Sequence, residues 1–211
     1  MFLGNRGCLV NDDRQVVRHH LGQLWIICVL AYKDWKSPLD EPRHWTPLFF
    51  LDDAVALAAG HRPCGLCRRP EYLAYQEGVR LGLGLENAPS ANDLNKMLSR
   101  ERLASGRGLS RAGDRILWEA KLATLPEGTV VADDGRPLLV AGGRLLQFSW
   151  DGWIDGGSEV SDRVVSVLTP PTSVLAMSHG YEPVLHASAR NRGLRQSRSP
   201  PHRPFLVPPP S

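Results

Sequence analysis

Cysteine is the residue type whose spacing in this chain most clearly points to chemistry. Cys64 and Cys67 form a Cys-x-x-Cys pair, and Cys8 and Cys28 precede it. Two thiolates at this spacing can bind one zinc ion, because the turn between them directs both sulfurs to the same point. The N-terminus lacks the layout of a secretory signal, so we expect a cytoplasmic protein whose cysteines are metal ligands or free thiols. The sequence therefore predicts zinc at Cys64 and Cys67.

A zinc site of this kind needs further ligands, and the chain offers several candidates. Cys8 and Cys28 would complete a set of four thiolates, which is typical of a closed structural centre with no position left for water. Cys28 lies in an apolar run, however, where a cysteine can also be a small buried hydrophobic residue. His44 and His61 are the alternatives, since either could replace a missing cysteine.

The residues before the cysteine pair predict a short helix followed by a tight turn. Asp52 or Asp53 is suited to cap the start of the helix, and Gly60 is suited to the left-handed conformation just after its end. Pro63 then restricts the backbone that leads into Cys64. The helix, the glycine after its end and the restricted backbone at Pro63 would hold the cysteine pair in a fixed position.

Residues 49–68 also carry a resemblance to a known family. Phe49-Phe50, followed by Ala-Leu-Ala-Ala-Gly-x-Arg-Pro-Cys-x-x-Cys, is similar to the second half of the Ada-type zinc domain of bacterial regulators of DNA alkylation repair. The resemblance implies a bound zinc ion and contact with DNA or RNA. The Cys-x-x-x-Cys motif that carries the methyl acceptor in those proteins is missing, so methyl transfer is not expected. The chain also resembles a group of uncharacterised bacterial proteins that begin near a Gly-Asn-Arg-Gly-Cys segment.

The charge of the chain is divided unevenly. The sequence has 25 basic and 22 acidic side chains. Residues 187–211 contain five arginines and no acid, so the other 186 residues carry 20 basic and 22 acidic side chains. The basic character thus belongs to the C-terminal stretch, and the rest of the chain has no general attraction for polyanions. No run of eighteen apolar residues is present, so no membrane span is expected.

Local clusters of arginine are the candidates for contact with nucleic acid. One group surrounds the cysteine pair and another follows further along the chain; together they are Arg62, Arg68, Arg69, Arg107, Arg111 and Arg115. Side chains of this type position a protein on phosphates without reading sequence. Two alternatives stay open: an enzyme that takes a small anionic substrate in a cleft between the two parts of the chain, and a protein-interaction module.

The overall pattern predicts an α+β fold. Residues 1–85 are expected to form a zinc-stabilised part with short helices, and residues 86–186 an α+β part that packs with it. Helices are expected from Pro70 and from a capping box at Ser90. A β-meander over 129–148, a strand near 164–168 and a short helix before Gly180 should follow. The acidic, glycine-rich stretch 151–162 is expected to be a loop, and residues 187–211 a disordered Arg/Pro-rich tail.

Overall fold

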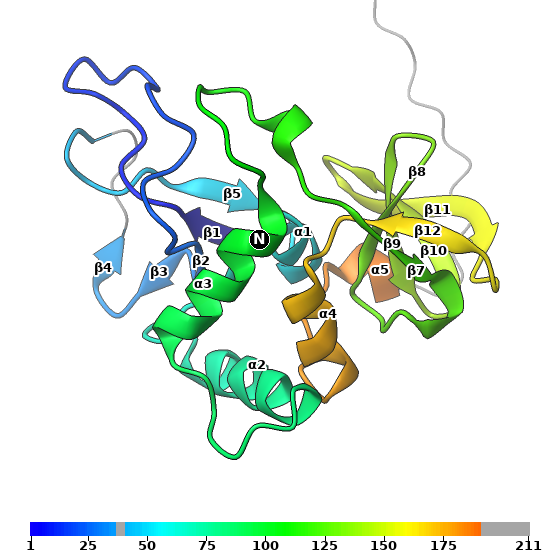
Figure 1. Ribbon diagram of the computed structural model, residues 1–211. Helices are drawn as coiled ribbons and strands as arrows, with labels where there is room; N and C mark the ends of the chain where they lie inside the picture. Colours follow the sequence, from blue (N-terminus) through cyan, green and yellow to red (C-terminus); the bar gives the residue numbers. More distant parts are fainter. Residues whose placement is uncertain (37–40, 191–211) are drawn as a thin grey trace, which may run out of the picture.

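The computed structural model describes residues 1–36 and 41–190, and its mixed α/β architecture confirms the predicted fold class. Figure 1 shows two sheets on opposite sides of the short helix α1 (Asp53–Ala58), with helices α2 (Arg69–Gly82), α3 (Ala91–Arg102) and α4 (Pro171–Ser178) on one side of them. None of the helices in the described ranges combines the length and the apolar composition that crossing a bilayer requires.

The N-terminal sheet is small and has the strand order β5-β1-β2-β6. Its strands are β1 (Phe2–Asn5), β2 (Ile26–Cys28), β5 (Leu48–Phe50) and β6 (Arg62–Pro63). β1 pairs antiparallel with both β2 and β5, whereas β2 and β6 are parallel. A separate short hairpin joins β3 (Ala31–Tyr32) to β4 (Trp35–Lys36). The parallel pair places the C-terminal ends of β2 and β6 side by side.

The helix-boundary predictions around the cysteine pair are confirmed. The Asp52 side chain accepts a hydrogen bond from the Val55 backbone N–H at 3.1 Å and caps α1. Gly60 follows the helix with a φ of 82°, a left-handed conformation that is strained for residues with a Cβ. The capping box at Ser90 and Asp93 is present at the start of α3. On α2, Tyr72, Tyr75 and Val79 form the buried stripe that the sequence predicts.

The C-terminal sheet is antiparallel throughout and has the order β11-β10-β9-β8-β12-β7. The predicted meander is confirmed as β8 (Val130–Asp133), β9 (Arg136–Ala141) and β10 (Arg144–Ser149). β12 (Val164–Val167) and the helix α4 also lie where the sequence predicts them. Two edge strands were missed: β7 (Trp118–Lys121), and β11 (Gly152–Glu159), which occupies the stretch expected to be a loop.

The end of the described chain is ordered further than predicted. Residues 187–190 form a short helix, α5 (Ala187–Arg190), although the tail was expected to be disordered from residue 187. The Ser188 hydroxyl accepts a hydrogen bond from the Trp153 backbone N–H at 2.8 Å, which joins α5 to β11. The rest of the predicted tail, residues 191–211, lies outside the described residues.

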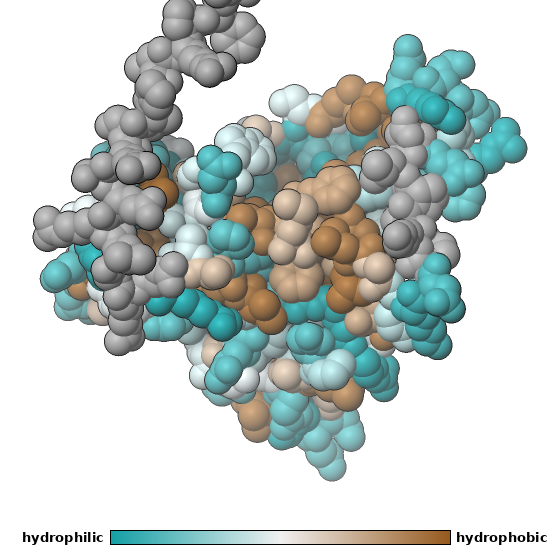
Figure 2. All heavy atoms as spheres, turned by 180° about the vertical axis from the view of Figure 1, so that it is seen from behind, coloured by the Kyte–Doolittle hydropathy of each residue, from teal (hydrophilic) through white to brown (hydrophobic). Residues whose placement is uncertain are grey.

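Two buried aspartates connect α1 to the end of the chain. Asp52 accepts hydrogen bonds from the Trp153 indole N–H at 2.6 Å and from the His186 backbone N–H at 3.0 Å. Asp53 forms a buried ion pair with Arg68 and also accepts from the Val184 backbone N–H at 2.9 Å. The two parts predicted from the sequence are therefore joined through hydrogen bonds to two buried carboxylates. Figure 2 shows that the opposite face of the molecule carries apolar side chains near its middle, with hydrophilic ones around them.

Candidate metal centre

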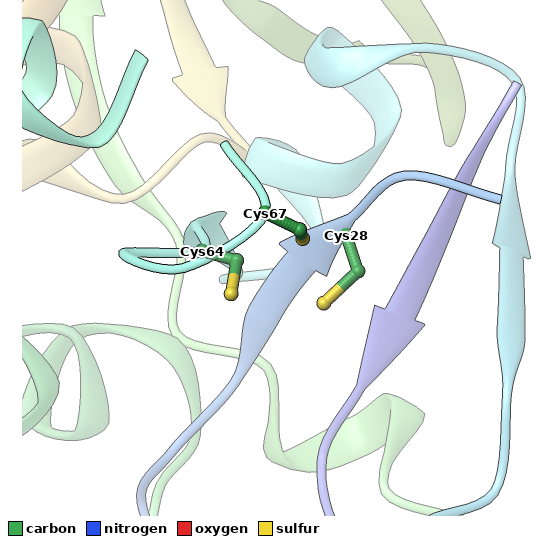
Figure 3. Close-up of side chains that lie close together, drawn as sticks. All are labelled: Cys28, Cys64 and Cys67. Carbon is green, nitrogen blue, oxygen red and sulfur yellow. The ribbon is translucent and has the colours of Figure 1, made fainter. Parts of the chain in front are cut away.

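Three of the four cysteines lie together. The Sγ atoms of Cys28, Cys64 and Cys67 are all within 4.8 Å of one another. Cys28 ends strand β2, while Cys64 and Cys67 belong to the turn between β6 and α2 (Figure 3). Tetrahedral zinc–thiolate sites have Zn–S distances of about 2.3 Å, so their sulfurs lie somewhat less than 4 Å apart. Sulfurs already this close need only small side-chain rotations to bind one ion.

The parallel pairing of β2 with β6 produces this arrangement. Ile26 pairs with Arg62 and Ile27 with Pro63, and the Cys64 backbone N–H donates to the Ile27 carbonyl at 3.0 Å. Cys28 and Cys64 are the next residues on the two paired segments, so they leave the sheet side by side. Sequence spacing alone does not contain this information, because it depends on which strands pair.

The turn after Cys64 brings Cys67 back to the same point. The Leu66 backbone N–H donates to the Cys64 Sγ at 3.4 Å, and the Arg68 N–H donates to the Cys64 carbonyl at 3.2 Å. An N–H that points at a cysteine sulfur stabilises the thiolate form, which is the form that binds a metal. The turn therefore prepares Cys64 as a ligand.

The three thiols share their protons unevenly. Hydrogen bonds from Cys28 and Cys67 lower the pKa of Cys64 far below that of a free thiol, with a further contribution from the Leu66 N–H. The hydrogen bonds with Cys64 and Cys67 raise the pKa of Cys28 in turn. These directions favour the thiolate form at Cys64. A divalent cation would replace the remaining thiol protons, since each sulfur would then donate its electron pair to the metal.

Cys8 is not brought to this group. Its thiol donates to the Val10 carbonyl at 3.4 Å, and the described residues provide no fourth His, Cys, Asp or Glu that joins the three sulfurs within the same distance. His61 is fully buried between Trp25 and Phe50, with ring centroids 5.2 Å and 4.8 Å away. His44 contacts the Pro42 carbonyl and Glu41.

The six arginines predicted to contact nucleic acid fall into two sets. Arg62, Arg68 and Arg111 are buried, and each forms hydrogen bonds within the chain. Arg69 and Arg107 are exposed. Arg115 is partly buried and donates to the carbonyls of Ala58 and Leu168, so four of the six arginines form hydrogen bonds within the chain.

A basic cluster that sequence reasoning did not assemble lies at the junction of the two parts. Arg6, His19 and Arg115 line a small pocket there. His19 and Arg6 both contact the buried Trp25 ring.

Comparison of the chain with protein-family models, with curated proteins and with solved structures gives no match in any of the three. The function must therefore be argued from the geometry of the sites.

Proposed function

We propose that the protein is a zinc-binding protein, in which Cys28, Cys64 and Cys67 hold the ion. The observation that carries the proposal is the approach of all three sulfurs to within 4.8 Å of one another. A ligand set made only of thiolates selects soft or borderline metals, and zinc is the one among them that has no redox chemistry. The resemblance of residues 49–68 to the Ada-type zinc domain supports the same choice.

The proposed ion would have a structural role, although three protein ligands leave its fourth coordination position to water or another ligand. It would join strand β2 to the segment that leads into α2, and these elements otherwise meet through two residue pairs of a short parallel ladder. Arg62 lies beside the site, where its guanidinium donates to the Asn95 side chain at 2.9 Å and packs over the Tyr72 ring at 5.2 Å. A positive charge there offsets the net negative charge of a zinc ion bound by three thiolates.

Metal analysis of the purified protein tests the proposal. We expect one zinc per chain when the protein is purified without chelator. In the same preparation a thiol reagent should modify Cys8 quickly and the other three cysteines only after a chelator is added, because a metal-bound sulfur is a poor nucleophile. A metal-free protein in which all four thiols react at similar rates would contradict the proposal.

Contact with DNA or RNA is a second candidate, and the position of Arg69 favours it. This side chain is exposed at the first residue of α2, two residues after Cys67, and Arg107 is exposed as well. With only these two of the predicted arginines fully exposed, we expect weak binding with a log–log salt slope of about −2 on duplex DNA. Fluorescence anisotropy at low salt measures this, and Arg69→Gln should reduce the slope by about one. An unchanged slope would exclude Arg69 from the interface.

A further inference from the structure

A small pocket lies where the two parts of the chain meet, and no cysteine lines it. Its volume is about 320 Å³, at the lower end of the range for small-molecule sites. Arg6, His19 and Trp25 line it from the first part, and Leu103, Arg115 and Leu168 from the second. The polar groups of the lining are therefore two guanidiniums and an imidazole, with no carboxylate among them.

The arginines around this pocket have no acidic partner among the described residues. Arg6 and Arg115 line the pocket, and Arg102 stacks on the same Trp25 ring as Arg6, with guanidinium carbons 3.8 Å and 5.3 Å from the ring centroid. Within residues 1–36 and 41–190, none of these three arginines forms an ion pair. Burial, and then the charges of Arg115 and Arg6, lower the pKa of Arg102 to about 9. Gathering three like charges without a counterion costs free energy that an anion would recover.

The histidines add neutral groups rather than more charge. Arg6 donates from Nη1 to His19 Nε2 at 3.2 Å, and His19 Nδ1 lies 3.0 Å from His20 Nδ1. Since a guanidinium can only donate, His19 Nε2 accepts, its Nδ1 carries the proton, and that proton is donated to His20. Burial lowers the pKa of His19 to about 4, with Arg6 the next cause, so the ring is neutral near pH 7. The chain of bonds holds Arg6 in place.

Some of the polar atoms here have no partner. The Nε of Arg6 is buried without a hydrogen-bond acceptor among the described residues. His61 packs against Trp25 and is fully buried. Neither of its ring nitrogens has a hydrogen-bond partner among the described residues. Buried donors are almost always satisfied in folded proteins, so an unpaired guanidinium N–H in the lining of a pocket indicates a missing acceptor.

We propose that this pocket binds a phosphate group, with Arg6 and Arg115 as its direct donors and Arg102, which stacks on Trp25, contributing positive charge. Guanidinium is the side chain best suited to phosphate, because its parallel N–H groups match two phosphate oxygens. The Nη2 of Arg115 donates to two backbone carbonyls, so its position is fixed before any ligand arrives. The proposal goes beyond zinc binding and does not depend on it, since no cysteine lines the pocket.

Thermal unfolding of the full chain with inorganic phosphate tests the site. At constant ionic strength set with sodium chloride, low millimolar phosphate should raise the Tm of the wild-type protein. Arg6→Gln should weaken phosphate binding by about tenfold to a hundredfold, since it removes charge-assisted hydrogen bonds. Without phosphate this variant should unfold at or above the wild-type temperature, because it relieves repulsion; a residue with only a structural role would instead lower it.

Arg107→Gln is the matched control, because Arg107 is exposed and does not line the pocket, and it should keep the full phosphate response. A short oligonucleotide forms the second arm of the titration. If inorganic phosphate binds at the Arg6-dependent site, the site accepts a single phosphate group. If only the oligonucleotide binds there, the phosphate belongs to a nucleic-acid backbone. An equal response of wild type and Arg6→Gln to both probes would overturn the proposal. Zinc content measured on the same samples keeps this result separate from that of the metal site.

Discussion

Replacing Cys64 by serine is expected to abolish zinc binding and to lower the free energy of unfolding by about 4 kcal/mol. That figure is what a ligand contributes when its free concentration is a thousandfold above its Kd and it binds only the folded state. Serine keeps the backbone hydrogen bonds of Cys64 to Ile27 and Arg68, so the loss isolates the sulfur. Denaturant unfolding with and without a chelator measures it: the chelator should destabilise the wild type and leave Cys64→Ser unchanged.

Cys8→Ser provides the control for this experiment. Cys8 donates to the Val10 carbonyl and lies outside the group of three sulfurs, so a serine hydroxyl can take over this hydrogen bond. We expect wild-type metal content and an unfolding free energy changed by less than about 1 kcal/mol. A Cys8→Ser protein that loses its zinc would show that Cys8 is a ligand and would require the segment after β1 to move.

Asp53→Asn should be nearly as damaging, although it changes no atom at the metal centre. Asp53 and Arg68 have side-chain exposures of 0% and 1%, and the carboxylate also accepts from Tyr181 Oη at 3.2 Å and from the Val184 N–H at 2.9 Å. The amide preserves the volume but removes the buried counterion of the Arg68 guanidinium. Removing one partner of a buried pair costs about 3–5 kcal/mol, which denaturant unfolding would detect directly.

Arg68 also offers its own control, because it faces a second acid. Glu71 lies 3.8 Å from Arg68 Nη2 but its side chain is 35% exposed. Glu71→Gln should therefore cost less than about 1 kcal/mol. The double variant Asp53→Asn/Arg68→Met should cost less than the sum of its single variants, since the second change removes the charge that the first one strands. Additive costs would mean that the two side chains do not depend on each other.

Local signals predicted the elements around the cysteine pair well. Asp52, Gly60 and Ser90 act through hydrogen bonds and backbone angles within a few residues of themselves, and each ends or begins a helix as expected. β11 was missed for a different reason. Its glycines and acids resemble a loop, but pairing with β10, with a register shift between Leu145 and Leu146, makes it an edge strand.

The placement of Cys8 required information that spacing does not contain. β1 and β2 are antiparallel, with Leu3 opposite Cys28 and Asn5 opposite Ile26. Each further step along the chain toward Cys8 therefore leads away from Cys28, at about 3.3 Å per residue in extended backbone. Had the strands been parallel, residues after β1 would have run toward the cysteine pair. Strand direction, a tertiary property, decides which cysteines meet.

The sequence also did not show which arginines are buried and which are exposed. Arg62, Arg68 and Arg111 are buried, whereas Arg107 and Arg69, which directly follows Arg68 in the sequence, are exposed. Their partners, such as Asp53 for Arg68 and Asn95 for Arg62, are 15 and 33 residues away. The pocket at Arg6 is formed by residues from both parts of the chain, so no local pattern could have shown it.

The bonds between α1 and the end of the chain also constrain how the protein is made. Synthesis proceeds from the N-terminus, and Val184, which donates to Asp53, leaves the ribosome 131 residues after it. His186, the partner of Asp52, follows Asp52 by 134 residues. A nascent chain that already contains Cys28, Cys64 and Cys67 thus still lacks these donors for both aspartates. Asp52 and Asp53 can complete their hydrogen bonds only after residues 184–186 have been synthesised.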